Sequence, residues 1–272
     1  MPSPATITTS QLARLIGTPA APTVVDVCRE EDFAADQSLI PAAFRYPFDQ
    51  LGLLLPELRG LKVVVVCEDG KALSQGAAAM LRVQGIAAEI LEGGRRAWRE
   101  AGEIMVPAAK IPRLTGATKS LWVTRQRPKI DRIACPWLIR RFVDARAQFL
   151  FVPPAEVLPV AEKLDAIPFD VEGVFWSHRG DRCTFDTMIE EFGLGTEPLK
   201  RLADIVRGAD TNRHEIAPQA AGLLAVSLGL SRMFRDDLEQ LEAGMLLYDS
   251  LYRWARDAID EGHDWPAAIS RT

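Results

Sequence analysis

The sequence lacks any long hydrophobic run. No apolar stretch approaches the roughly 18 residues that a membrane-spanning helix needs. The first residues, MPSPATITTSQLARLIG, also lack the basic stretch and following apolar stretch of a secretory leader. These two absences exclude a membrane-embedded class and predict a cytoplasmic protein without a membrane partner.

Cysteine and histidine are scarce as well. The four cysteines are spread along the chain with no CxxC pair, so the sequence suggests neither a disulfide framework nor a cysteine zinc site. We therefore expect reduced thiols. The three histidines include no HExxH spacing, and we expect one of them, His263, at the surface.

The hydrophobic pattern divides the chain into two parts. In 1–106, short β-branched runs at 23–27 and 62–66 and a third candidate strand at 87–91 alternate with helical stretches such as SQGAAAMLRVQG. This alternation predicts a doubly wound parallel α/β domain, with a helix ended by Gly85. Residues 107–118 are rich in proline and small residues and predict a linker.

The second predicted domain, 119–272, is mainly α-helical (α+β). We expect strands at LWVTR and QFLFVP around a helix over 132–143, which Asp131 would cap, and helices after about 183. The last helix carries an apolar stripe that is either core or the seam of a homodimer. The stripe comprises Leu238, Leu241, Met245, Tyr248, Tyr252, Ala255 and Ile259.

Charge is unevenly distributed. The net charge is −5, yet 110–146 contains ten Lys and Arg against Asp131 and Asp144. Such a basic segment can form ion pairs with the acidic rest of the chain, bind a small oxyanion or bind nucleic acid. Nucleic acid is disfavoured, because the protein as a whole would repel a polyanion.

One short segment places a thiol at the end of a strand. In VVVVCEDGKALSQ, Cys67 follows four valines and precedes a glycine-containing loop and a helix. Backbone N–H groups and the helix dipole at such a position stabilise a thiolate or a bound oxyanion. Cys67 is therefore either a nucleophile or a buried thiol in a scaffold that has lost its chemistry.

The neighbouring motifs carry a resemblance. DVCREEDF, IPAA, VVVVCEDG and LEGGRRAWREAG follow in order the pattern of rhodanese-like domains over about 1–106. The resemblance implies that Cys67 carries a persulfide, Gly70 gives the tight turn and Lys71 holds an anionic sulfur donor. Glu68 and Asp69 depart from the pattern, since carboxylates beside the thiol should repel that donor.

From this resemblance we expect Cys67 to be exposed and able to carry sulfur, as a weak rhodanese-type sulfurtransferase. The alternative is an inactive scaffold used for docking or sensing. Ala72 and Leu73, which stand where the family commonly has Arg, Thr or Ser, favour that alternative.

Polar side chains in the second part suggest a metal site. Asp186 and Glu190 are four residues apart, as are Asp210 and His214, and His178 precedes both pairs. Carboxylates with imidazole suit a divalent metal, Fe, Mn or Zn. The competing interpretation is that these pairs are solvated helix faces.

Five arginines could instead converge on a tetrahedral dianion by forked hydrogen bonds. Salt bridges to nearby carboxylates are the competing explanation. The candidates for this oxyanion site are Arg125, Arg127, Arg132, Arg179 and Arg182.

The second part also carries a resemblance, across about 119–265. WVTRQRPKIDRIACPWLIRRFVD, HRGDRCTFDTMIEEFGL, IVRGADTNRHEIAPQAAGLLAVSLGLSR and LEQLEAGMLLYDSLYRWARDA are very similar to the C-terminal domain of the ChrB-type chromate-resistance family. The resemblance implies a bacterial protein of chromate detoxification or chromate-dependent regulation. Many relatives have a different N-terminal region, which puts a DNA-binding role in doubt here.

Two functions follow from these features. In one, the second domain binds a metal or oxyanion and Cys67 delivers sulfur during chromate or sulfur stress. Chromate mimics sulfate, which gives a physical reason for joining a sulfur-handling fold to an oxyanion-handling one. In the other, the protein is a non-catalytic chromate sensor or regulatory adaptor.

Overall fold

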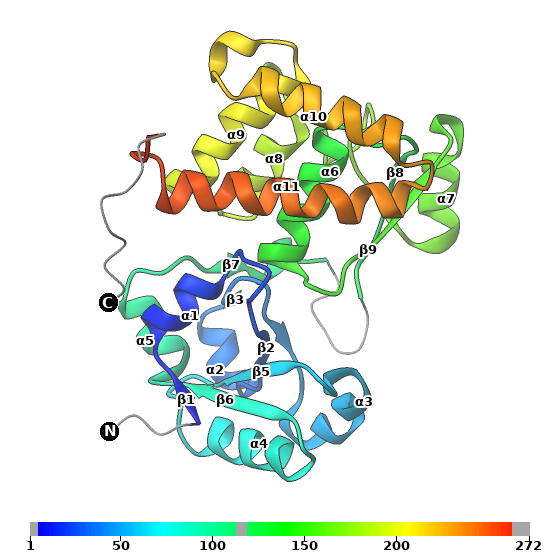
Figure 1. The fold of residues 1–272 in the computed structure, drawn as a ribbon. Helices are drawn as coiled ribbons and strands as arrows, with labels where there is room; N and C mark the ends of the chain where they lie inside the picture. Colours follow the sequence, from blue (N-terminus) through cyan, green and yellow to red (C-terminus); the bar gives the residue numbers. More distant parts are fainter. Residues whose placement is uncertain (1–4, 113–118, 263–272) are drawn as a thin grey trace.

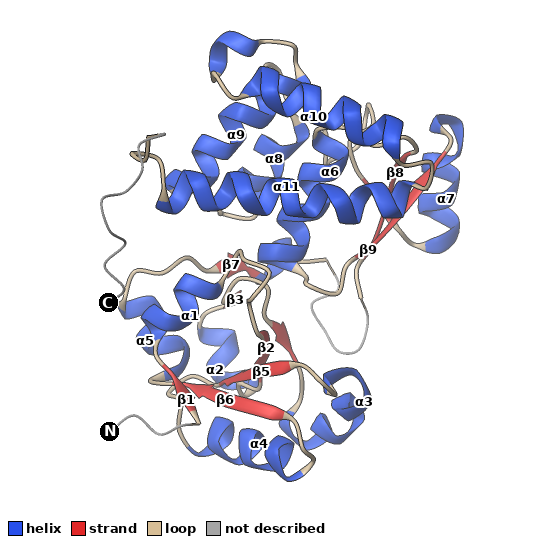
Figure 2. Cartoon of the chain, in the orientation of Figure 1, coloured by secondary structure: helices blue, strands red, loops and turns tan. Residues whose placement is uncertain are grey.

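The computed structural model describes residues 5–112 and 119–262. Its N-terminal part is built on a five-stranded parallel sheet of order β1-β6-β5-β2-β4 (Figures 1 and 2). The strands are β1 (Thr6–Ile7), β2 (Thr23–Asp26), β4 (Phe44–Arg45), β5 (Lys62–Val66) and β6 (Ala87–Leu91). Valines of β2 and β5 are buried on both faces, as expected for central parallel strands.

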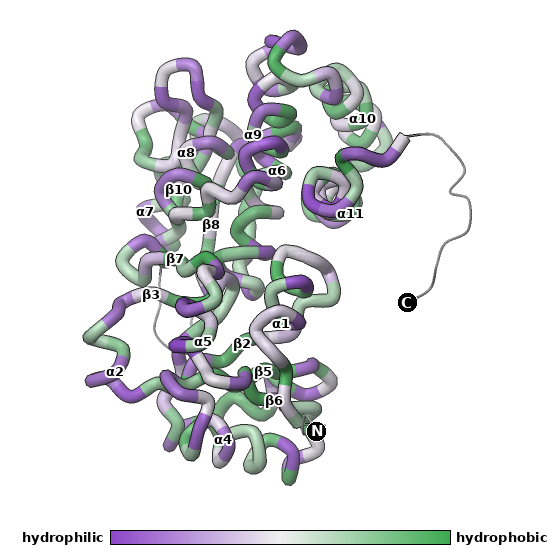
Figure 3. The backbone as a smooth tube through the Cα atoms, turned by 90° about the vertical axis from the view of Figure 1, so that its left-hand side faces the viewer, coloured by the Kyte–Doolittle hydropathy of each residue, from purple (hydrophilic) through white to green (hydrophobic). Residues whose placement is uncertain are grey.

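Helices cover this sheet, and the prediction of a doubly wound α/β domain is confirmed. They are α1 (Thr9–Leu15), α2 (Glu30–Ala35), α3 (Leu55–Leu58), α4 (Ala72–Val83) and α5 (Gly94–Glu100), with the 3-10 helix η1 (Phe48–Leu54). Figure 3 shows that hydrophobic residues, in green, lie along β5 and β6. The alanines Ala77 and Ala78 of α4 are fully buried, which lets this helix pack closely on the sheet.

Part of the predicted linker belongs to the first domain. β7 (Val106–Pro107) pairs antiparallel with β3 (Ser38–Leu39), and the 3-10 helix η2 (Ala108–Lys110) follows it. The rest of the predicted linker, 113–118, lies outside the described residues, as does His263.

The second part is rich in helices around a three-stranded parallel sheet of order β10-β8-β9. The strands are β8 (Leu121–Arg125), β9 (Gln148–Val152) and β10 (Ile167–Pro168). The helices are α6 (Asp131–Leu138), continued by the π-helical turn η3 (Ile139–Val143), α7 (Val157–Leu164), α8 (Thr184–Glu191), α9 (Glu197–Asp210), α10 (Ala220–Met233) and α11 (Asp237–Asp257), with 3-10 turns η4 (Pro154–Glu156) and η5 (His214–Ile216). The strands at LWVTR and QFLFVP and the helical region after about 183 are confirmed.

The stripe of α11 faces the interior of the chain. Its members Leu241, Met245, Tyr248, Tyr252 and Ala255 are buried. Leu238 is half exposed, and Ile259 lies beyond the end of the helix. The stripe therefore serves the chain's own core, while a homodimer stays a prediction.

The two parts pack against each other. The amide of Ala42 donates to Phe142 O over 2.8 Å, and Gly17 lies against the rings of Phe142 and Tyr252. A single cluster of buried apolar residues runs through both parts. Within the described ranges, no helix is long and apolar enough to cross a membrane.

Candidate functional site

Three carboxylates surround one histidine nitrogen in the second part. His178 Nε2 lies 3.5 Å from Asp131 Oδ2, 3.4 Å from Asp170 Oδ1 and 3.2 Å from Asp210 Oδ2. Asp131 begins α6, Asp210 ends α9, and Asp170 and His178 lie between β10 and α8. The fold thus brings residues of three chain segments together, and we call these four residues the His178 cluster.

Burial and charge shift the ionisation of this cluster. Asp131 is only 1% exposed, and burial raises its pKa to about 7. The side chain of His178 is 41% exposed, and contacts with Asp131, Asp170 and Asp210 raise its pKa to about 12. Burial also acts to raise the pKa of Asp170, but contacts with His178 and Arg125 outweigh it and leave that pKa below its ordinary value. The pKa values of Asp131 and Asp170 are therefore shifted in opposite directions.

Asp131 does not cap its helix as the sequence predicted. It is the first residue of α6 rather than the residue before it, and no side chain caps this helix. Its Oδ2 accepts a 2.6 Å hydrogen bond from the Thr184 amide, which turns the carboxylate toward α8 and the cluster. Its Oδ1 is buried and has no hydrogen-bond donor among the described residues.

Two arginines adjoin the cluster. Asp170 Oδ2 accepts a 2.9 Å hydrogen bond from Arg125 Nη2 and lies 3.3 Å from Arg132 Nε. A pocket of about 530 Å³ opens beside His178. The pocket is lined by Arg125, Asp170, Val171, Glu172, Gly173, Val174, Ser177 and His178.

The other predicted metal ligands have different surroundings. The Asp186 carboxylate accepts 2.6 Å and 3.0 Å hydrogen bonds from Arg207 Nη1 and the Cys183 amide. Glu190 pairs with Arg182, and His214 lies in η5, apart from the residues that could share a metal ion. The structure thus brings His178 and Asp210 of the predicted set into contact, but of that set only His178 belongs to the group that could share a metal ion.

The five candidate arginines do not converge. Arg127 donates to the carbonyl oxygens of Ser231 and Phe234. Arg179 donates to Glu191 over 2.6 Å. Only Arg125 and Arg132 of the five have a contact with the His178 cluster among the described residues, and both contacts are to Asp170.

The cysteine loop differs from expectation in one respect. Cys67, expected to be exposed, is only 6% exposed. Its Sγ donates to Ser74 Oγ over 3.1 Å, and Ser74 Oγ donates to Lys71 O over 3.2 Å. Gly70 has φ +65°, as the predicted tight turn requires, and Lys71 is exposed directly before α4. Ser74, one residue beyond Leu73, was not predicted as a residue of this site.

The acidic side chains of the loop pair with α5. Asp69 lies 2.6 Å from Arg96, and Glu68 pairs with Arg99. Main-chain bonds reinforce the contact, because the amides of Arg95 and Arg96 donate over 3.0 Å to the carbonyls of Cys67 and Glu68. The α5 arginines therefore offset the carboxylates that were expected to repel an anionic donor.

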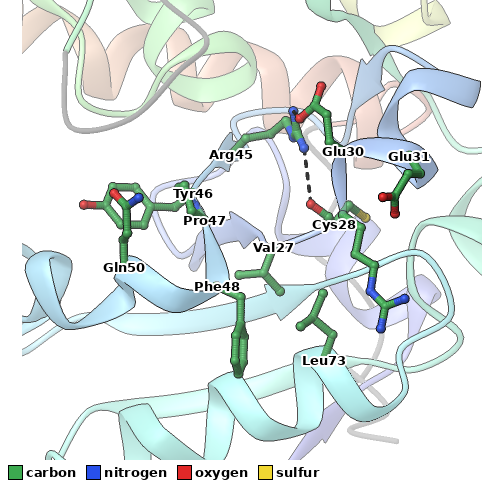
Figure 4. A pocket seen from close by; sticks show the side chains of 11 residues that line it. Val27, Cys28, Glu30, Glu31, Arg45, Tyr46, Pro47, Phe48, Gln50 and Leu73 are labelled. Carbon is green, nitrogen blue, oxygen red and sulfur yellow. Dashed lines mark hydrogen bonds and ion pairs between the residues drawn. The ribbon is translucent and has the colours of Figure 1, made fainter.

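A second pocket, of about 740 Å³, lies in the first part (Figure 4). Its lining includes Cys28 but not Cys67, and Figure 4 shows Val27, Phe48 and Leu73 grouped on its apolar side. Burial, followed by the nearby Asp26 carboxylate, raises the pKa of Cys28. A thiol with a raised pKa is a poor nucleophile, so this pocket does not present an activated cysteine.

Comparison with known families matches both parts of the chain. The ChrB C-terminal domain matches residues 122–255, and the rhodanese-like domain matches residues 8–101. Both resemblances inferred from the sequence are thereby confirmed.

One known protein is similar to more than half of the chain. Protein ChrB from Cupriavidus metallidurans is 38% identical over 155 residues, which cover 56% of this chain and 46% of that protein. The match thus spans less than half of that relative.

Among solved structures, a rhodanese-related protein from Thermoplasma volcanium is 26% identical with a TM-score of 0.33, over 37% of this chain and 96% of its own. A rhodanese-like domain protein from Staphylococcus aureus is 30% identical with a TM-score of 0.31, over 34% of this chain and 89% of its own.

Proposed function

We propose that this chain, which joins a rhodanese-like domain to a ChrB C-terminal domain, is a cytoplasmic chromate-resistance or stress protein whose second domain binds a divalent metal ion. One observation carries the metal proposal. Three carboxylates meet around His178 Nε2, and one of them, Asp131, is buried with an oxygen that no described donor contacts.

Electrostatics explain why such a cluster favours a cation. Carboxylates held close together in a buried place repel one another, and a buried carboxylate oxygen without a donor, such as Asp131 Oδ1, is costly. A divalent ion among them removes both penalties. Oxygen ligands with one imidazole suit Mn and Fe(II), and Zn accepts the same donors.

Each residue would have a distinct part in holding the ion. Asp131 and Asp170 would supply oxygen ligands, and His178 would supply Nε2 after losing its proton. Asp210 contacts His178 Nε2 but lies outside the group whose atoms could share one ion. The Thr184 amide fixes Asp131, while the Thr184 hydroxyl donates over 3.0 Å to Asp170 Oδ1 and fixes that carboxylate. A bound ion would act as a Lewis acid toward a ligand in the adjoining pocket.

Elemental analysis of protein purified without chelators tests the proposal. We expect about one metal ion per chain in the wild type, and about tenfold lower occupancy in Asp131→Asn and His178→Ala, because each loses a ligand. Asp204→Asn is the matched control, since it removes a carboxylate that pairs with Arg207 outside the cluster. His214→Ala should retain the metal. Wild-type protein without metal, or Asp131→Asn with full metal, would contradict the proposal.

The burial of Cys67 favours a second candidate function. In this alternative the rhodanese-like domain transfers no sulfur, and the protein is a non-catalytic chromate sensor or regulatory adaptor. In the first candidate the domain is a weak sulfurtransferase, and Cys67 carries sulfane sulfur. A persulfide test of Cys67, described below, separates the two.

A further inference from the structure

The pocket beside the His178 cluster combines acidic and basic groups. Arg125 lines it with Asp170 and His178, and the Arg125 side chain is 40% exposed. Arg125 Nη2 contacts Asp170, and its Nε is buried. Because the side chain is 40% exposed and lines the pocket, the rest of the guanidinium retains donor capacity toward a ligand there.

The net charge of this region depends on the metal. The three aspartates of the cluster are at least equal in number to the cationic groups around them, Arg125, Arg132 and His178, so the metal-free group has no excess positive charge to attract an anion. A divalent ion among the carboxylates adds positive charge beside the pocket. Glu172, on the rim, is exposed, and solvent screens its charge.

Coordination leads to the same conclusion. The cluster offers one ligand atom from each of three residues, Asp131, Asp170 and His178, whereas Mn and Fe(II) commonly take six ligands. The remaining positions would be open to the ligand that enters from the pocket. An arginine fork beside an open metal position matches the geometry of a small oxyanion.

We propose that this pocket binds a small tetrahedral oxyanion only when the metal ion is in place, with the anion between the metal and Arg125. The inference rests on the proposed metal site and extends it, because it names the class of ligand and makes the metal a condition of binding. Arg127, Arg179 and Arg182 have no part in it. Metal-free protein would therefore bind the anion more weakly than metal-loaded protein does.

Calorimetric titration of sulfate into the full chain tests this inference. Sulfate is tetrahedral and does not oxidise the protein or its metal. We expect binding to Mn(II)-loaded protein that is about tenfold or more tighter than binding to chelator-treated protein, which corresponds to about 1.4 kcal/mol. Arg125→Gln should take up Mn(II) yet lose about tenfold in sulfate affinity, because it lacks the charged fork.

Arg253→Gln is the control, because Arg253 pairs with Asp257 over 2.9 Å, a distance equal to that of Arg125 to Asp170. This variant should bind sulfate like the wild type. Equal sulfate affinity with and without metal, or an unchanged affinity in Arg125→Gln, would overturn the inference and leave the metal site standing. If wild-type protein takes up no Mn(II), the proposed function and the inference both fail.

Discussion

At the scale of single residues, the thiol of Cys67 is held by a hydrogen bond to one hydroxyl group, that of Ser74. Ser74 Oγ accepts from Cys67 Sγ and in turn donates to Lys71 O, so the thiol acts as a donor in a short chain of hydrogen bonds. Ser74 is itself fully buried. A sulfur donor must displace this arrangement to reach Sγ, which favours slow rather than fast transfer.

We predict that thiosulfate forms a persulfide on Cys67 slowly. The thiolate forms a bond to the outer sulfur of thiosulfate, while the S–S bond of thiosulfate breaks and its electron pair leaves on sulfite. Mass spectrometry should find the added sulfur in the wild type and in Cys28→Ser, but not in Cys67→Ser. Cys28 is a suitable control, since it is a buried thiol of the same domain. A persulfide retained in Cys67→Ser, or no persulfide in the wild type, would exclude sulfur transfer by Cys67 and favour the non-catalytic sensor or adaptor.

The His178 cluster shows which site residues the spacing of residues along the sequence can predict and which it cannot. His178 and Asp210 were predicted because histidine and carboxylates gather in 178–214. Asp131 was missed because it lies on a distant helix that only the tertiary fold brings to His178, and Asp170 because it lies in the non-helical connection before His178. The i,i+4 rule finds neighbours on one helix, whereas this site is assembled from three chain segments.

At the scale of secondary structure, the first turn of α5 supports the cysteine loop. Gly94 has φ +62°, and a Cβ at this position would collide with the main chain of the loop, including Gly70 N at 2.5 Å. Main-chain atoms cannot move aside as a flexible side chain can. The close approach of α5 to the loop therefore requires glycine here.

Replacement of Gly94 by alanine should destabilise the protein strongly. We expect Gly94→Ala to lower the free energy of unfolding by about 3 kcal/mol or more, since it adds a main-chain clash to the strain of a positive φ. Gly102→Ala should cost only about 1 kcal/mol, because Gly102 has φ +73° and no described atom lies within 4 Å of its Cβ position. Urea denaturation followed by circular dichroism compares them, and equal losses would contradict the proposed support.

Strands could be predicted from the sequence where their hydrophobic pattern extends over several residues. The β-branched runs of β2 and β5 identified buried strands because both faces are covered. The two-residue strands β1 and β4 have no comparable pattern, since they are extended by pairing with β6 and β2 rather than by their own composition. The same holds for β7, whose pairing with β3 lies at the start of the predicted linker.

At the scale of the whole molecule, the two domains share one buried surface. The helix α6 and its π-helical turn run from Asp131, in the His178 cluster, to Phe142, whose carbonyl accepts from Ala42 of the first domain. Arg256 Nη1 adds a contact to Ile16 O over 3.4 Å. Two domains could be inferred from sequence, but this contact could not, because no local pattern marks Gly17 or Phe142 as partners.

The contact at Gly17 predicts that the domains stabilise each other. Gly17 has φ +78°, and an added Cβ would collide with the buried Phe142 ring and lie 2.8 Å from Tyr252 Cε1. These rings pack together, 5.5 Å between centroids, so neither can yield without disturbing the other. We expect Gly17→Ala to lose about 1–3 kcal/mol more than Gly60→Ala, because Gly60 has φ +80° with no described atom within 4 Å of its Cβ position. Denaturation followed by tryptophan fluorescence, which reports mainly on the second domain, measures the difference. Equal midpoints would mean that the second domain draws no stability from the first, whereas an earlier transition in Gly17→Ala would show that a change in the rhodanese-like domain reaches the ChrB C-terminal domain.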